Sequence, residues 1–223
     1  MINYTLTRSG RKTVGICIRN GKVEVRAPHA CPKSEIDKLI AAKQTWITDK
    51  LAQSQNQTQQ KNSFRLHYGS KLLFRGRLYP VTAKTGAHAG FDGSSFYMPP
   101  NLSPAQIKEL CIKIYKNLAK TRITNTVASI AAHMGVTPTS IKINSAKTRW
   151  GSCSSRKGLN FSWRLVMAPD DVIDYVVVHE LAHFFQMNHS AKFWAIVEQV
   201  LPDYKQRQAK LKELQKRLAT EDW

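Results

Sequence analysis

Apolar and polar residues alternate along the first part of the chain in the way that β-strands require. The alternation covers residues 2–8, 13–19 and 22–27, and Asn20-Gly21 between the last two favours a type I′ hairpin turn. From Pro32 to about Ala52 the apolar residues recur every three or four positions. This spacing predicts a helix with one apolar face, made of Ile36, Leu39, Ile40, Trp46, Ile47 and Leu51.

A polar, glutamine-rich stretch follows this helix. Residues 53–62 hold no apolar side chain, which favours a linker. Beyond it, short apolar segments between Phe64 and Met98 are interrupted by glycines and predict several short β-strands. The N-terminal region, residues 1–100, is therefore expected to be β-rich, with one helix and the linker.

The second region, residues 101–223, combines long helical periods with a few short strands. Ser103 and Gln106 form the signature of a helix N-terminus, and Gly135 is suited to end that helix after Met134. Strands are predicted at residues 141–143, 148–153 and 159–166, and further helices from Pro169, from Ala191 and from Asp203. Together these elements predict an α+β fold, in which a helix packs on a small, mainly antiparallel sheet.

The most specific motif of the chain is a histidine cluster on the helix that begins near Pro169. In His179-Glu180-Leu181-Ala182-His183 the two histidines are four residues apart, so they share one face of the helix and can bind one metal ion. Glu180 is placed to hold a metal-bound water and to act as general base. A third ligand would complete a catalytic zinc site with one open position.

His189 is the expected third ligand, and Glu198 on the next helix is the alternative. A continuous helix would carry His189 away from the other two imidazoles. We therefore expect the helix to end near Met187 and the chain to reverse at Asn188, because asparagine tolerates the left-handed conformation. Ser190 then caps the following helix. Such a site holds one Zn²⁺ ion per chain, or another divalent metal.

The stretch from Lys147 to Trp194 resembles the YgjP-like metallopeptidase family. The likeness rests on ordered motifs: Lys147-Thr148-Arg149-Trp150-Gly151-Ser152-Cys153-Ser154, Leu159-Asn160, Trp163-Arg164-Leu165, Pro169, Tyr175-Val176, the histidine-containing helix, and Asn188-His189-Ser190 with Phe193-Trp194. The resemblance implies a zincin-like catalytic domain in which His179, His183 and His189 bind zinc and Glu180 is the base. It leaves the substrate open. Related SprT-like and WLM proteins include proteases that act on DNA-bound proteins, whereas some members of this family are described as UTP pyrophosphatases.

The charge of the chain points to anionic ligands. The formal net charge is +19, and no acidic residue occurs from Leu110 to Pro169. A basic field of this kind attracts polyanions and phosphates, so contact with an anionic substrate or with nucleic acid is expected. No membrane contact is expected. Four residues near the motif are candidates for binding substrate or a developing oxyanion: Lys147, Arg149, Arg164 and Tyr175.

Cysteine usage and hydropathy favour a cytoplasmic protein. The four cysteines lie far apart without metal-binding spacing, which is typical of reduced thiols, and no apolar run approaches a membrane span. Three functions are compatible with the sequence: a metallopeptidase-like zinc hydrolase, a UTP pyrophosphatase that releases UMP and diphosphate, and a non-catalytic polyanion-binding protein with a structural metal. The last is least favoured, because structural zinc sites normally fill all four positions with Cys or His.

Overall fold

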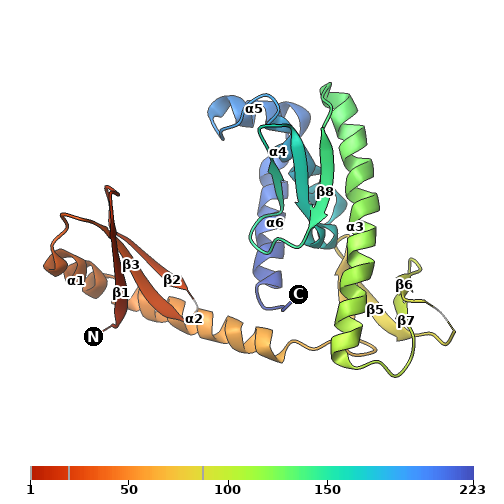
Figure 1. Ribbon diagram of the computed structural model, residues 1–223, viewed down its shortest axis with the longest axis horizontal. Helices are drawn as coiled ribbons and strands as arrows, with labels where there is room; N and C mark the ends of the chain where they lie inside the picture. The colour runs from red at the N-terminus through yellow and green to blue at the C-terminus, as the bar shows by residue number, and fades with distance from the viewer. Residues whose placement is uncertain (1, 20, 87) are drawn as a thin grey trace. The chain divides into compact units, whose positions relative to one another are not determined.

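The computed structural model describes residues 2–19, 21–86 and 88–223, and its contacts divide the chain into two units (Figure 1). Unit 1 comprises Met1–Phe64 and Arg217–Asp222, and unit 2 comprises Arg65–Lys216 and Trp223. The predicted class, α+β with a β-containing N-terminal region, is confirmed. The strands between Phe64 and Met98 belong to unit 2 by their contacts. The division of domains at residues 100 and 101 stays a prediction.

Unit 1 is a small sheet covered by helices. β3 (Lys22–Pro28) lies in the middle, parallel to β1 (Tyr4–Ser9) and antiparallel to β2 (Gly15–Arg19). The predicted strands are thus confirmed, while the Asn20 half of the predicted hairpin turn lies outside the described residues. Alternate residues of β3 form the core with one face of the helices; its buried members are Val23, Val25, Ala27, Ile36, Ile40 and Ile47.

The helical part of unit 1 differs from the prediction in two ways. The helix breaks at Lys43 into α1 (Lys33–Ala42) and α2 (Gln44–Ser63). The stretch predicted as a linker, residues 53–62, is helical, because α2 continues through it. The stretch contains no glycine or proline, and glutamine and lysine are good helix formers. Since extending an existing helix is far easier than starting one, the polar residues continue α2.

Unit 2 begins with a four-stranded sheet followed by the longest helix. The strand order is β4 (Lys71–Phe74), β5 (Arg77–Ala83), β7 (Phe96–Met98), β6 (Gly90–Phe91). α3 (Pro104–Met134) has the predicted capping box of Ser103 and Gln106, and Gly135 ends it in the left-handed conformation at φ 67°. Figure 1 shows α3 running beside β8 (Ser140–Asn144).

A second small sheet and the last helices complete unit 2. β10 (Gly158–Ser162) lies between β8, to which it is parallel, and β9 (Gly151–Cys153), to which it is antiparallel. The strand predicted to Val166 ends at Ser162 and continues as a buried 3₁₀ helix, Trp163–Met167. The helices that follow are α4 (Asp170–Ala182), α5 (Ala191–Val200) and α6 (Tyr204–Leu218).

α4 is the central helix of unit 2 and packs against α3, α5 and β9. Its apolar side chains are buried nearly all round, as expected for a helix in a core. Pro169 is its N-cap residue rather than its first helical residue, and Asp170 and Asp171 occupy the first turn. Among the described residues, no helix combines the length and the apolar character that crossing a bilayer requires.

An ion-pair network fixes the start of α4. Asp170 accepts hydrogen bonds from Arg75 in the β4–β5 turn, with Nε 2.8 Å from Oδ1, and from Arg122 of α3, whose Nε is 3.0 Å from the same oxygen. Arg122 also reaches Asp174, one turn further along α4, at 3.3 Å. Hydrogen bonds from Arg75 and then Arg122 hold the pKa of Asp170 below its ordinary value. The β4–β5 turn and α3 are thereby tied to the first turn of α4.

Replacing Asp170 by Asn should lower the free energy of unfolding at pH 7 by about 1 kcal/mol, a modest loss because both arginine pairs are partly exposed. A carboxylate whose folded pKa is lowered stabilises the fold above its unfolded pKa of about 4, and that contribution is lost as the pH falls through the folded value. The difference in the free energy of unfolding between wild type and D170N should therefore become smaller below pH 4. Chemical denaturation at several pH values measures it, with D49N, at an exposed position of α2, as the control. If the two free energies of unfolding differ as much at low pH as at pH 7, the charge of Asp170 is not what stabilises the fold.

Candidate metal centre

The end of α4 determines where the histidines lie. α4 stops at Ala182, and His183 is its C-cap residue. The amides of Phe184 and Phe185 then donate to the carbonyls of Leu181 and Ala182 at 3.0 and 3.1 Å, which closes a tight turn. The predicted end near Met187 is thus wrong by about one turn of helix. Each of these amides donates to the carbonyl three residues earlier, as in a 3₁₀ helix. This pattern tightens the last turn and ends the α-helix early.

The chain reverses after α4 without a left-handed pivot. The described residues other than glycine that have positive φ are Arg75, Asn101 and Lys157, so the left-handed conformation predicted for Asn188 is wrong. Because the turn begins at His183, the reversal is spread over several residues before α5 starts at Ala191. Gln186 and Asn188 are joined within this loop by a side-chain hydrogen bond of 2.6 Å.

The reversal brings three imidazoles together. Ligand atoms of His179, His183 and His189 all lie within 4.8 Å of one another, and the Nε2 atoms of His179 and His189 are 3.0 Å apart. His183 Nδ1 lies 3.1 Å from the carbonyl oxygen of Gln186, which leaves Nε2 as its ligand atom. His189 joins the cluster, whereas the alternative ligand Glu198, on α5, is not part of it.

The chemistry of these three side chains fits a divalent metal ion. Burial, and then the neighbouring His183 and His189, lower the pKa of His179 to about 4, and burial also lowers the pKa of His183. Both are therefore neutral at pH 7, the form in which imidazole binds metal. Two nitrogens bound tetrahedrally at about 2.0–2.1 Å from zinc are about 3.3 Å apart. The spacing of 3.0 Å between His179 and His189 is close to that value.

Phe193 holds the three imidazoles in place. Its ring centroid is 4.9 Å from that of His179 and 4.7 Å from those of His183 and His189, and its side chain is fully buried. Trp194 packs beside His179 and His189 and stacks on Tyr204 at 5.4 Å. Ser190 is the N-cap residue of α5 as predicted, although its side chain forms no capping hydrogen bond.

Glu180 lies buried beside the imidazoles and against the edge strand β9. Only 5% of the residue is exposed, and burial raises the pKa of its carboxyl to about 7. Gly151 of β9 is the reason that the side chain fits. A Cβ atom at Gly151 would lie 2.6 Å from both Cγ and Oε1 of Glu180. The absence of a side chain at this glycine therefore leaves the space that the carboxylate occupies.

Two pockets meet at Gly151, His179 and Glu180. The first, of about 200 Å³, is completed by Arg149, Trp150, Tyr175, Val176 and Leu211. The second, of about 260 Å³, is completed by Ser152, Cys153, His183, Met187 and His189. The first is therefore lined by the residues that lead into β9, the second by β9 itself, and Glu180 lines both.

Two of the four candidate substrate-binding residues line a pocket, and the other two do not. Arg149 and Tyr175 line the first pocket, and the Tyr175 ring lies 6.1 Å from that of His179. Burial raises the pKa of Tyr175, and its side chain forms a hydrogen bond with that of Gln208. Lys147 is exposed and is not among the residues that line either pocket.

Arg164 lies in the core and lines neither pocket. It is 8% exposed, and its guanidinium donates to the carbonyl oxygens of Ser145 and Trp223 at 3.0 and 2.7 Å. It also stacks over the ring of Trp163 at 4.5 Å. These contacts favour a structural role, and the predicted binding role stays a prediction. A sequence motif does not reveal whether an arginine points into a cleft or into the core.

Three features of the site were not recognised from the sequence: the packing role of Phe193, the space left by Gly151 and the pocket wall formed by Met187. A signal existed for Gly151, because an isolated glycine in a strand marks the close approach of another group. Phe193 and Met187 gave no such signal, since apolar residues in this pattern are equally typical of an ordinary core.

Replacing Gly151 by Ala should lower hydrolytic activity by about tenfold or more while the metal content stays unchanged. The added methyl group forces the Glu180 carboxylate out of its place, and small displacements of a catalytic group have effects of this size. Gly10→Ala in unit 1, where an added Cβ atom would meet nothing within 4 Å, is the matched control. Activity and bound metal should be measured on the same preparations. Full activity in G151A would show that the position of Glu180 is not critical.

Comparison with known proteins agrees with this site. The chain matches the family model described as YgjP-like, metallopeptidase domain, over residues 12–214. Among solved structures, it is similar to the crystal structure of the metallopeptidase zymogen of Pyrococcus abyssi abylysin, with 20% identity and a TM-score of 0.37, over 40% of this chain and 90% of that chain. No curated protein matches the chain.

Proposed function

The chain belongs to the YgjP-like metallopeptidase family and is a metal-dependent hydrolase. From this premise we propose that it is a zinc peptidase. His179, His183 and His189 hold one Zn²⁺ ion, and Glu180 is the general base. The observation that carries the proposal is the convergence of the three imidazoles within 4.8 Å beside the buried Glu180 and the edge strand β9.

The residues of the site divide the chemical work between them. When bound, Zn²⁺ supplies a Lewis acid and lowers the pKa of water toward neutrality. Glu180 accepts a proton from the attacking water and returns it to the leaving amine. Burial alone raises the pKa of Glu180 to about 7, and a divalent cation nearby favours the ionised form that a base requires. Tyr175 and Arg149 are the proposed donors to the developing oxyanion.

The edge of β9 is the proposed binding site for an extended peptide. β9 is the outermost strand in the order β8-β10-β9, and an outer strand can pair with a further segment on its other side. Met187 is 55% exposed and lines the second pocket, where it offers an apolar wall to a substrate side chain. These features suit a peptide better than a small molecule.

UTP pyrophosphatase activity is the second candidate function. Arg149, Trp150 and Tyr175 lie together in the first pocket, where a cation and two aromatic side chains could receive a nucleotide. A triphosphate needs several cations, however. Within the described residues, Arg149 is the single cationic side chain that lines the two pockets, and Arg164 is engaged elsewhere. Contact with nucleic acid stays a prediction from the net charge of +19.

Side-by-side incubation separates the two activities. The zinc-loaded full chain should cleave a reduced and alkylated, unfolded protein, detected by mass spectrometry of new termini, and it should leave UTP intact. Glu180→Gln should abolish the cleavage. Release of UMP and diphosphate that is lost in the same variant, without cleavage of the unfolded protein, would establish the pyrophosphatase and overturn the peptidase.

A further inference from the structure

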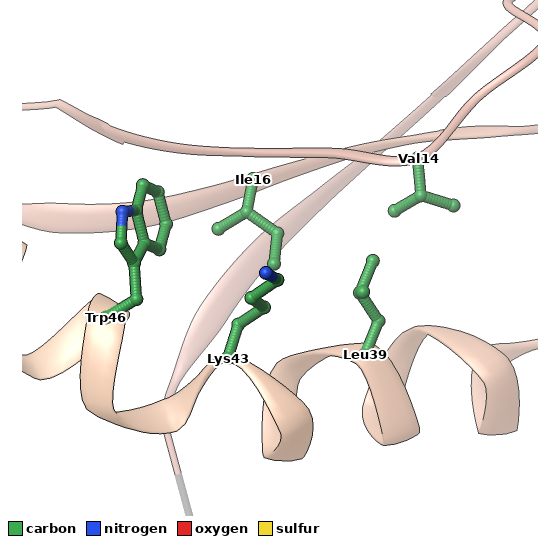
Figure 2. A pocket seen from close by; sticks show the side chains of 5 residues that line it. All are labelled: Val14, Ile16, Leu39, Lys43 and Trp46. Atoms are coloured by element: carbon green, nitrogen blue, oxygen red, sulfur yellow. The ribbon is translucent and has the colours of Figure 1, made fainter.

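Unit 1 contains a groove that the hydrolase site does not use. A pocket of about 280 Å³ lies between β2 and the helices, and Figure 2 shows side chains from the strand facing side chains from the helices across it. It is lined by Val14, Ile16, Leu39, Lys43 and Trp46. A second pocket, of about 480 Å³, shares Ile16 and Trp46 with the first and continues along β2 to Ile18 and along α2 to Gln57. The two form one groove, here called the β2 groove.

One wall of the β2 groove is the edge of a sheet. β2 is outermost in the order β1-β3-β2 and pairs with β3 over its whole length, Gly15–Arg19. In the part of the chain that the structure describes, no strand pairs with its other side. An outer strand presents backbone amides and carbonyls that can pair with an added strand. A groove between such a strand and a helix is a common site for extended peptides.

The other wall carries an exposed aromatic ring. Trp46 on α2 is 42% exposed, although tryptophan side chains are largely buried in most proteins. Its ring lies beside Ile16, and Leu39 lies opposite Val14 (Figure 2). These four apolar side chains, together with Lys43, line the pocket of about 280 Å³.

The charges that line the groove are all positive. Lys43 stands at the break between α1 and α2, and its side chain rises toward Ile16 (Figure 2). Lys50 lines the continuation of the groove and donates to Gln53 at 2.9 Å. Among the described residues, no aspartate or glutamate lines either pocket. A segment bound there is therefore favoured if it carries carboxylates beside its apolar residue.

We propose that the β2 groove binds an extended acidic segment of another protein. The segment adds to the free edge of β2, places one bulky apolar side chain between Val14, Ile16, Leu39 and Trp46, and sets a carboxylate against Lys43. This docking site lies in unit 1, whereas the histidine cluster lies in unit 2, so its occupancy requires neither a metal ion nor hydrolysis.

A phage-displayed library of random short peptides, selected on the full chain with Glu180→Gln to prevent cleavage, tests the proposal. The enriched peptides should share a bulky apolar residue flanked by Asp or Glu. Fluorescence anisotropy of one such labelled peptide should show binding that Trp46→Ala or Lys43→Glu weakens by about tenfold or more. Lys38→Glu is the matched control, because this exposed lysine of α1 does not line the groove; binding should be unchanged.

The mode of binding is tested with the same peptide. Methylation of alternate backbone amides should abolish its binding, because strand addition needs those donors. Failure to enrich any peptide, or binding that is indifferent to Trp46→Ala and Lys43→Glu, would overturn the proposal. Tight binding of a labelled oligouridylate that depends on both residues and displaces the peptide would instead identify the groove as a nucleic-acid site.

Discussion

Glu180→Gln should reduce peptide hydrolysis by about 100- to 10,000-fold, the usual contribution of a positioned general base. Glutamine keeps the size of the side chain and fills the space beside Gly151, but it cannot accept a proton. The loss should appear in kcat and leave the metal content unchanged, because the residue lies beside the imidazoles without belonging to their cluster. Cleavage rates and elemental analysis of wild type and variant measure both quantities.

Glu198→Gln is the matched control for this experiment. Glu198 is exposed on α5 and lies outside the histidine cluster, so its replacement should change neither rate nor metal content. Loss of bound metal in Glu180→Gln would identify Glu180 as a ligand and contradict its role as the base. Unchanged activity in Glu180→Gln would show that another residue is the general base.

His189→Ala should lower zinc affinity by at least about 100-fold and abolish hydrolysis. Substituting partners that only orient metal ligands already costs about 10- to 100-fold in affinity, so loss of a ligand costs more. Competition with a zinc-chelating dye measures the affinity. The exposed His133 near the end of α3 provides the control, and His133→Ala should bind zinc as wild type does. Retention of tight binding in His189→Ala would mean that His189 is not a ligand.

Local chemistry made much of the fold predictable. The capping box at Ser103, the left-handed Gly135 and the strands of unit 1 follow from signals within a few residues, and the structure contains them. The polarity of residues 53–62, in contrast, did not predict their conformation. A polar stretch without glycine or proline can extend a helix as readily as it can form a loop, and the residues before it decide the outcome.

The grouping of the three histidines was predictable because helix geometry allows them to meet in one way. His179 and His183 share a helical face by spacing alone, and His189 can approach them only if the chain reverses. The manner of the reversal was not predictable, because no glycine or proline between His179 and His189 marks the end of α4 at Ala182. Burial was equally hidden: Arg149 lines a pocket, whereas Arg164, in the same motif region, lies in the core.

The most direct test of the account is the zinc content of the full chain, measured by elemental analysis after equilibration with Zn²⁺ and removal of the excess. We predict one zinc ion per wild-type chain, and none in a variant that lacks His179, His183 and His189. A wild-type chain that retains no stoichiometric zinc or other divalent metal, or a triple variant that retains as much, would contradict the central claim that these three imidazoles form the metal centre of a hydrolase.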